Sequence, residues 1–497
     1  MSLGDGRDGK LRMAMAKGRL SGKLAQMSLP RQIASIATWP FLEQLLSFFC
    51  AAVALFLAGH MDIPAEETPH VISGLGVAGT IMWLGFLMQA GVATGATALV
   101  SRSFGARQFE EANYNCNQAA ILGAMAGTAS TILMLVSARF LLGTVLELSS
   151  QALDAAMQYI HVAAWIAVCS GAVFALNASL RGAGDTRTPF FLMLLIDGLT
   201  IVLSYLFITY CGMGIEGLGW GALIPWVIGV SVLFFHLNRA RLKQERARQD
   251  VPLDEYCAQQ GQDYAPALAL NIGRLRPDWA VIRRIVEIGL PQALEVGAIW
   301  AIQFYGLRLI TSLGTVAVGA HTVAIRIESL SFLPGFAIGV AGSALVGQYL
   351  GSGSVRMATE TVKRCVLIAL VFMGTMGILF ASFPYFFAGI FVGEAGALQD
   401  SVVDVLRVLV IAEPLFAAVL VLRMCLRGAG DTKRVMWVSF GCMGFFRIIV
   451  QSIWYYGFPD TFSLVGVWML YNVDLCIQAV ILWWMIKGLK WSRKMRV

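Results

Sequence analysis

Long apolar stretches alternate with short polar segments along almost the whole chain. Each stretch has about twenty apolar residues with few charges, which is the length needed to cross a bilayer as an α-helix. The apolar runs are continuous rather than alternating residue by residue, so they favour helices over a closed β-barrel. The pattern therefore predicts an all-α membrane protein with twelve transmembrane helices.

The twelve predicted helices form two groups of six. The first group covers residues 33–59, 71–100, 113–142, 153–180, 189–210 and 217–235, and the second covers residues 285–312, 315–349, 358–383, 400–426, 435–456 and 464–486. The predicted parts are a cytoplasmic basic tail that we expect to be disordered (1–32), an N-lobe (33–237), a cytoplasmic or interfacial linker (238–284), a C-lobe (285–487) and a second cytoplasmic basic tail (488–497). Within the linker, we expect residues 239–248 to continue helix 6 and residues 279–284 to form an amphipathic helix on the inner leaflet.

Composition and charge support this topology. Hydrophobic residues make up 58% of the chain and charged residues 13%, whereas soluble domains have about 25% charged residues. With both termini inside, 32 of the 37 Lys and Arg residues fall in segments predicted to be cytoplasmic, as the positive-inside rule requires. We therefore expect a multi-pass protein of the plasma membrane or the bacterial inner membrane.

A seven-residue sequence occurs twice, 246 residues apart. Leu-Arg-Gly-Ala-Gly-Asp-Thr occupies residues 180–186 and again residues 426–432. Each copy follows a predicted helix, so glycine should supply the positive φ that ends the helix, and Asp-Thr should cap the next one. The residues concerned are Arg181, Asp185, Thr186, Arg427, Asp431 and Thr432. We expect the arginines to bind carbonyls or lipid phosphates, in a turn that either defines the fold or gates the cytoplasmic ends of the two halves.

Two six-helix halves with the same orientation are typical of a transporter with its substrate site near the membrane midplane, although a channel has the same helix count. Further motifs are Gly-Ala-Thr-Ala-Leu-Val-Ser-Arg-Ser-Phe-Gly-Ala (95–106), Glu-Ser-Leu-Ser-Phe-Leu-Pro-Gly-Phe (328–336) and Leu-Val-Gly-Gln-Tyr-Leu-Gly (345–351). Together with the doubled motif, they resemble the multidrug and toxin extrusion (MATE) family. The resemblance implies a V-shaped pair of six-helix lobes that exports cationic or amphipathic compounds, driven by inward flow of H⁺ or Na⁺.

Charged residues within predicted spans are functional candidates, because they are expensive to bury in a bilayer. They concentrate in the C-lobe, which contains Glu295, Arg326, Glu328, Glu413, Arg447 and Asp474. Our hypothesis is that the coupling ion binds there. Carboxyl groups in a low dielectric take up protons more readily than in water, and Glu295 and Glu413 offer oxygen ligands for Na⁺. The alternative is that Arg447–Asp474 and Arg326–Glu328 are buried pairs that fix helix packing. If Glu295 couples transport, E295Q should abolish coupled export and leave expression unchanged.

The N-lobe departs from the pattern of many MATE proteins. Those relatives carry an Asp late in helix 1 and an Asn and an Asp four apart in helix 5, whereas this chain has Ala54, Thr200 and Ser204 there. Asp197, three residues before Thr200, could substitute for the missing acid. Otherwise the chain couples through the C-lobe or transports without a coupling cation.

Several residues are candidates for a central substrate cavity. They are Glu43, Gln44, Met88, Asp197, Phe304 and Tyr305. Glu43 occupies the position in the first half that Glu295 occupies in the second, four or fewer residues after a proline. We therefore expect two acids facing a shared cavity suited to a cationic substrate, with aromatic side chains adding cation–π attraction.

The function expected from the sequence is H⁺- or Na⁺-coupled antiport of organic cations or amphipathic drugs by alternating access. The alternative is a flippase for lipids or lipid-linked precursors in the same two-lobe superfamily. No nucleophile–base set or nucleotide-binding strand–loop–helix appears in the sequence, so we expect no enzyme activity and no cofactor. The nine cysteines have no metal-ligand spacing. We expect a monomer that contacts a small-molecule substrate and membrane lipid but not nucleic acid.

Overall fold

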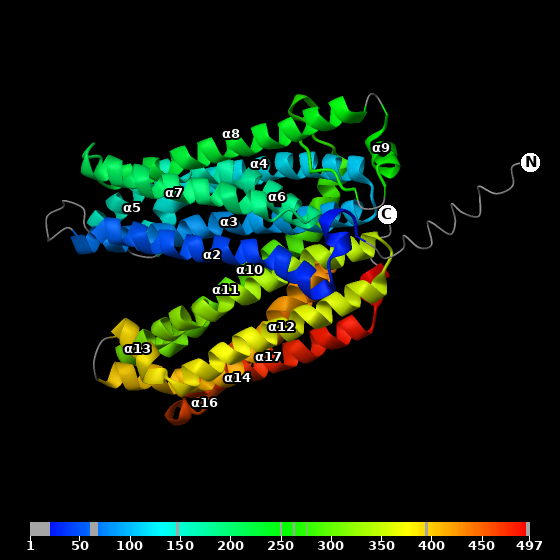
Figure 1. Cartoon of the computed structure of the whole chain (residues 1–497). Coiled ribbons are helices and arrows are strands. Elements are labelled where there is room, and N and C mark those ends of the chain that lie inside the picture. The colour runs from blue at the N-terminus through cyan, green and yellow to red at the C-terminus, as the bar shows by residue number, and fades with distance from the viewer. Residues whose placement is uncertain are drawn as a thin grey trace, which may run out of the picture. The chain divides into compact units, whose positions relative to one another are not determined.

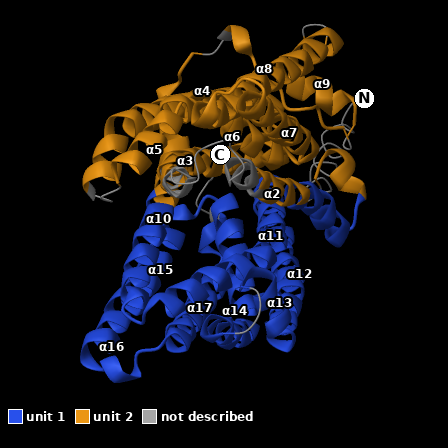
Figure 2. Ribbon diagram, turned by 90° about the vertical axis from the view of Figure 1, so that its left-hand side faces the viewer, with its two compact units in different colours: residues 1–18, 27–41, 294–497 blue, residues 19–26, 42–293 orange. Residues whose placement is uncertain are grey.

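A computed structural model describes residues 20–59, 68–145, 149–248, 251–261, 264–274, 276–392 and 396–493. All regular elements in these ranges are helical (Figure 1). Eleven helices are long and apolar enough to cross a membrane, and α3 (Thr68–Gly105) is also long enough to do so. The chain divides into two compact units, shown in separate colours in Figure 2. Unit 2 holds residues 42–293 with 20–26, and unit 1 holds residues 27–41 and those from 294 onward.

Two long helices begin in one unit and end in the other. They are α2 (Leu29–Gly59) and α10 (Trp279–Thr311). The unit boundary falls after Phe41 in α2 and after Ala293 in α10, one to two residues beyond Pro40 and Pro291. α10 starts earlier than predicted, because residues 279–284 form its first turns. The expected separate amphipathic helix at 279–284 is therefore wrong.

Unit 2 is built from helices that pack around several hydrophobic clusters. Besides α3, its helices are α4 (Phe109–Phe140), α5 (Ser150–Ala163), α6 (Ile166–Ala183), α7 (Arg187–Thr209), α8 (Gly214–Arg248) and α9 (Leu253–Gln259), with the short segments η1 (Gly22–Gln26), η2 (Leu141–Val145) and η3 (Ile272–Arg274). α8 continues to Arg248, which confirms that the basic stretch extends helix 6. Residues 22–26 of the predicted disordered tail form a helical turn instead, with Leu24 buried.

The predicted fourth helix is broken. α5 ends at Ala163 and α6 begins at Ile166, although the intervening Ala164 and Trp165 contain no helix breaker. The carbonyl of Ala164 accepts a hydrogen bond from the Thr131 hydroxyl (2.8 Å), and that of Ala167 accepts one from the Gln89 amide (3.2 Å). Side chains of neighbouring helices thus satisfy the carbonyls near the break, which is the condition for irregular backbone inside a membrane. A long-range effect of this kind leaves no local sequence signal.

The linker packs along the start of α4. The Asn113 side chain accepts a hydrogen bond from the backbone of Ala269, and the Asn117 side chain accepts one from Asn271 (2.8 and 2.9 Å). Asp278 accepts a hydrogen bond from the Tyr114 hydroxyl (2.7 Å). This bond and the backbone N–H of Ala280 hold the pKa of Asp278 below its usual range. The linker is therefore an ordered part of unit 2 rather than a free connection.

Unit 1 has one hydrophobic cluster that joins α10, α11, α14 and α17. Its elements are α11 (Thr315–Gly351), α12 (Val355–Ser382), α13 (Pro384–Val392), α14 (Ala397–Gly428), α15 (Thr432–Met443), the π-helical segment η4 (Gly444–Val450), α16 (Gln451–Gly457), η5 (Pro459–Thr461), α17 (Leu464–Lys487) and η6 (Lys490–Arg493). The predicted eleventh helix is therefore the run α15–η4–α16. The short helix α13 was not predicted and begins at Pro384, a residue favoured in the first turn.

Cysteine labelling tests the predicted orientation. Cys211 is exposed in the turn between α7 and α8, which we predict to face outside, whereas Cys257 is buried on the side predicted to be cytoplasmic. Cys476 is also exposed, but it lies in the middle of the apolar span α17 (Leu464–Lys487), where a membrane-impermeant reagent does not reach it. Burial raises the pKa of the Cys257 thiol to about 11, and the thiolate is the reactive form. A membrane-impermeant maleimide added to intact cells should therefore label the wild type but not C211S. Labelling of Cys211 only after permeabilisation would mean that the orientation is reversed.

Candidate functional site

The two copies of the repeated motif form the same turn. In the first copy, between α6 and α7, Gly184 has φ of 93° and the backbone N–H of Asp185 donates to the carbonyl of Leu180 at 2.9 Å. In the second copy, between α14 and α15, Gly430 has φ of 82° and Asp431 donates to Leu426 at 2.9 Å. This 6→1 bond after a left-handed glycine is a Schellman ending. The predicted role of glycine in ending both helices is confirmed.

The aspartates of the two turns behave differently. Asp185 accepts hydrogen bonds from the backbone N–H groups of Arg187 and Thr188, both at 3.1 Å, so it caps α7 as predicted. Asp431 instead accepts from the Arg434 side chain (3.0 Å). Thr186 and Thr432 are both buried beside the turns.

The arginine of the first turn binds a glutamate, a partner that the sequence did not indicate. A terminal nitrogen of Arg181 lies 2.5 and 2.6 Å from the two carboxylate oxygens of Glu43 in α2. Both side chains are largely buried. The charge of Glu43, a predicted cavity residue, is therefore balanced by an arginine within unit 2.

The second turn repeats this pair. Arg427 lies 2.9 Å from Glu295 in α10, and Arg423, one turn earlier in α14, lies 3.8 Å from the same carboxylate. The Ser439 hydroxyl of α15 donates to Glu295 at 2.5 Å. Glu295 is fully buried, so a single carboxylate is held by two arginines and a serine inside unit 1. Arg427, like Arg181, therefore has a glutamate partner that the sequence did not indicate, and the cavity expected to be shared by Glu43 and Glu295 stays a prediction because the two acids belong to different units.

Close backbone packing places both arginines. A Cβ on Gly182 would lie 3.1 Å from the carbonyl oxygen of Thr97, and a Cβ on Gly428 would lie 2.3 Å from that of Ser343. Thr97 and Ser343 are themselves 246 residues apart, the offset of the repeat. The glycine that follows each arginine therefore lets the helix end approach α3 or α11 in the same way in both halves.

A chain of polar contacts continues from Glu295 into unit 1. Arg423 also donates to Gln478 of α17, and the Gln478 amide donates to Asp474 at 2.6 Å. Asp474 accepts from Arg447 at 2.7 Å. Glu295, Arg423, Gln478, Asp474 and Arg447 thus form one buried network, named here the unit 1 polar network. Its charges are paired, as buried charges generally must be.

Arg447 is held on three sides. It lies in the π-helical segment η4, donates to Gln303 of α10 at 3.3 Å, and has its guanidinium carbon 4.1 Å from the centre of the Tyr471 ring. π-Helical turns often occur at functional positions because they change the phase of a helix. The Arg447–Asp474 pair that we predicted is present, and both side chains are buried.

Two further acids of unit 1 form no ion pair within 4 Å among the described residues. Glu413 in α14 is fully buried and accepts a hydrogen bond from the Ser331 hydroxyl of α11, while its other oxygen has no hydrogen-bond partner among the described residues. Glu328 is half-buried in α11, three residues before Ser331. Within the described ranges neither acid forms an ion pair, and Arg326 is exposed. The suggested Arg326–Glu328 pair is therefore not formed.

The N-lobe candidates lie in unit 2. Asp197 of α7 accepts a hydrogen bond from the Ser47 hydroxyl of α2 at 3.4 Å. Thr200 donates to the carbonyl of Ile196 in its own helix, and Ser204 is buried where α7 packs against Gly221. The side chain of Ala54 lies outside the described residues. Unit 2 thus brings Asp197 to within about one turn of Glu43 along α2, because its partner Ser47 lies four residues after Glu43.

The other predicted cavity residues are spread over several surfaces. Gln44 is half-buried in α2, Met88 is exposed in α3, and Phe304 is exposed beside Trp300. The Tyr305 hydroxyl shares a hydrogen bond with Ser452 (2.6 Å). In the part of the chain that the structure describes, no three His, Cys, Asp or Glu side chains gather as metal ligands. The two proposed Na⁺ ligands, Glu295 and Glu413, have different partners.

The sequence identified the charged residues within the spans but not the side chains that bind them. Arg423, Gln478, Gln303, Ser439 and Ser331 were not singled out, since polar residues on apolar helices are common. One signal did exist. The doubled arginine motif and the doubled Pro–Glu segment occur in both halves, so a contact made in one half should be made in the other.

The chain is similar in sequence to a family of known proteins along most of its length. A family model described as MatE matches residues 40–206 and 291–453. The chain is similar to "Probable multidrug resistance protein NorM" of Thermotoga maritima, with 25% identity over 430 residues, or 85% of this chain and 86% of that protein. A protein of the same name from Rhodopseudomonas palustris is 22% identical over 459 residues, or 90% of this chain and 89% of that protein.

A solved structure has the same fold. It is described as the outward-facing conformation of a multidrug resistance MATE family transporter of the MOP superfamily. Its TM-score with this chain is 0.78 at 20% identity, and the match covers 94% of this chain and 97% of that one. The likeness confirms the predicted all-α membrane fold.

Proposed function

Because the chain belongs to the multidrug and toxin extrusion (MATE) family of transporters, we propose that it exports organic cations or other amphipathic compounds by alternating access, in exchange for H⁺ or Na⁺. The proposal includes a location in the plasma membrane or bacterial inner membrane with both termini cytoplasmic, and action as a monomer. The relatives named as multidrug resistance proteins support a small-molecule cargo.

The observation that carries the coupling proposal is the contrast among the acids of unit 1. Glu295 and Asp474 are balanced by arginines, whereas Glu413 and Glu328 form no ion pair among the described residues. A carboxylate buried without a counter-charge is costly, and binding H⁺ or Na⁺ removes that cost. We assign ion coupling to Glu413 together with Glu328.

The paired residues have a different role in this proposal. Glu295 joins α10 to the motif turn after α14, and Asp474 joins α17 to η4. Such pairs orient helices and are costly to break. They therefore keep the coupling acids in place and do not bind the ion themselves, which narrows our earlier set of six candidates to two.

Asp197 lies in α7 of unit 2 and has no arginine partner among the described residues. Together with the exposed side chain of Met88 in the same unit, it suits a cationic, partly apolar substrate. We propose Asp197 and Met88 as substrate contacts of unit 2.

Transport by purified protein in proteoliposomes tests the proposal. A fluorescent organic cation should move only when a pH gradient or a Na⁺ gradient is imposed, and the effective gradient identifies the coupling ion. Flux that is equal with and without both gradients would contradict coupled export. An absence of flux, combined with transfer of lipid between leaflets, would instead favour the flippase. Arg423 and Arg447 of the unit 1 polar network, and Arg427 beside it, each lie within 3.8 Å of a buried acid, which does not favour a polyanionic substrate.

A further inference from the structure

An apolar groove runs along α4 of unit 2, on the side where α8 lies next to it (Figures 1 and 2). Its volume is about 580 Å³, within the range of small-molecule sites. The lining includes Ala120, Ile121, Ala124, Met125 and Thr128 of α4 and Phe234 of α8. Thr128 donates its hydroxyl proton to its own helix (2.9 Å), so the threonine has no proton to donate to a ligand.

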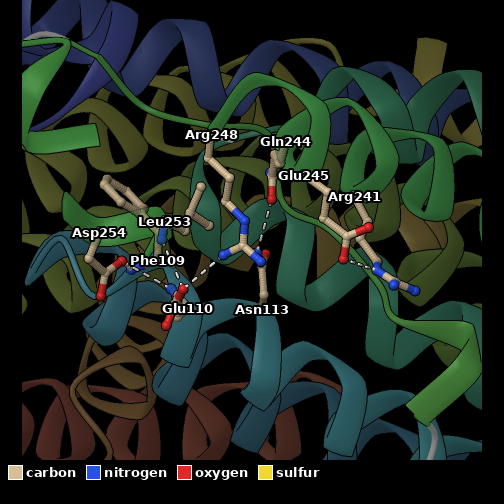
Figure 3. A network of polar contacts seen from close by, with 9 residues as sticks. All are labelled: Phe109, Glu110, Asn113, Arg241, Gln244, Glu245, Arg248, Leu253 and Asp254. Atoms are coloured by element: carbon tan, nitrogen blue, oxygen red, sulfur yellow. Dashed lines mark hydrogen bonds and ion pairs between the residues drawn. The ribbon is translucent and has the colours of Figure 1, made fainter. Parts of the chain in front are cut away.

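A polar pocket of about 290 Å³ lies between the same two helices, nearer the start of α4. Figure 3 shows its charged groups. Arg248 pairs with Glu110 at 3.1 Å, and Arg241 pairs with Glu245 at 2.8 Å. All four side chains remain between 28% and 51% exposed, so they are accessible to a further partner. The pocket thus presents two cations and two anions to the solvent side.

The pocket and the groove lie on the same faces of both helices. On α4, Asn113, Asn117, Ile121 and Ala124 follow one another at intervals of three or four residues, which is the spacing of one helical face. On α8, Phe234 and Arg241 are seven residues apart, or about two turns. A molecule in the groove would therefore have the charged pocket at one end.

The position of this pair of sites along the membrane normal follows from the sequence of α4. The helix from Phe109 onward is apolar enough to span a bilayer, and the pocket residues of α4, 110–117, occupy its first two turns. The pocket is therefore at the depth of lipid head groups, and the groove is at the depth of acyl chains. The basic end of α8 makes this the cytoplasmic side.

We propose that unit 2 holds one phospholipid at this place. An acyl chain lies in the groove along α4, the phosphate binds Arg241 and Arg248, and a head-group ammonium binds Glu245 and Glu110. Equal numbers of acids and arginines match a zwitterionic head group better than an anionic one, because the two glutamates attract a head-group ammonium and repel additional negative charge. A second copy of the chain fits less well, because its lipid-facing side chains would meet the charged pocket.

Native mass spectrometry of the purified full-length chain tests the proposal. The protein is offered equal amounts of phosphatidylethanolamine and phosphatidylglycerol with the same acyl chains. We expect one bound lipid per chain, with phosphatidylethanolamine preferred by about tenfold. Equal retention of the two lipids by the wild type would overturn the proposed head-group site, and a dimer without lipid would overturn the proposed occupant.

Two matched pairs of variants separate the acyl and head-group contacts. A124W fills the groove and should reduce bound lipid about tenfold, whereas V202W places the same side chain on the exposed surface of another helix, α7, and should have no effect. E245Q should retain lipid but lose the preference for phosphatidylethanolamine, whereas K243Q, at an exposed position beside it, should keep it. Unchanged lipid binding in A124W or unchanged preference in E245Q contradicts the proposal. E245Q changes only a half-exposed side chain, so it remains informative if A124W fails to fold.

Discussion

Replacing Glu413 with glutamine should reduce gradient-driven export to the rate measured without a gradient, a loss of at least about tenfold. Glutamine has nearly the same shape and can still accept the hydrogen bond from Ser331, but it neither binds and releases a proton nor carries a charge for Na⁺. Since Glu413 is fully buried without a counter-cation among the described residues, removing its charge should leave the folding of unit 1 intact. Flux in proteoliposomes and the thermal midpoint of the same preparation measure the two effects.

An acid elsewhere in unit 1 provides the control for E413Q. Glu360 in α12 pairs with Arg364 one turn away, and both side chains are exposed. E360Q should change neither flux nor the thermal midpoint, because exposed pairs contribute little. Normal gradient-driven export by E413Q would remove Glu413 from the coupling mechanism and leave Glu328 as the remaining candidate.

Replacing Glu295 with glutamine should mainly destabilise the protein. The carboxylate balances both Arg423 and Arg427 in the buried interior of unit 1, and removing one partner of a buried ion pair costs about 3–5 kcal/mol. For a unit of this size, we expect the thermal midpoint to fall by about 10 °C. The sequence-based expectation of unchanged expression is therefore replaced by one of reduced yield, measurable by fluorescence-detected size exclusion and thermal unfolding.

Two comparisons separate the effect of charge from that of contact loss. E43Q removes the corresponding acid of unit 2, where one arginine rather than two is left without its partner, so its midpoint should fall less. Adding R427M to E295Q removes one of the two unbalanced arginines and should recover part of the stability, as a double-mutant cycle would show. A thermal midpoint for E295Q equal to that of the wild type would contradict the structural role given to Glu295.

The sequence was sufficient for the helices because apolar length is a local property. Every predicted span corresponds to a helix or a run of helices in the structure, and α8 extends to Arg248 as expected. The structure differs from the prediction where contacts between distant residues determine the local backbone conformation. Ala164 and Trp165 separate α5 from α6, and the side chains of Thr131 and Gln89 donate hydrogen bonds to carbonyls near this break. None of these four residue types predicts a helix break from the sequence.

The candidate site could be predicted only in part. The intramembrane acids stand out in an apolar chain, and the Arg447–Asp474 pair was anticipated. The partner of each remaining acid depends on which helix faces which. Glu295 and Glu413 look alike in sequence, yet Glu295 lies beside Arg423 and Arg427, while Glu413 lies beside Ser331. The difference between their partners arises from the tertiary structure. It distinguishes Glu295, which has a structural role, from Glu413, which we propose to bind the coupling ion.

The two glutamate–arginine contacts also tell us where the chain tolerates changes of length. The partners are 138 residues apart in the first half, and the second pair is six residues closer in sequence. The first half has eight residues between α2 and α3, whereas the second has only three between α10 and α11. Most of the six-residue difference between the halves therefore lies in the connection between their first two helices, and the glutamate–arginine contact forms with either connection length. An epitope of a few residues inserted between Leu313 and Gly314 would make the second connection as long as the first, and this turn is accordingly the place to attach a reporter for antibody or fluorescence detection.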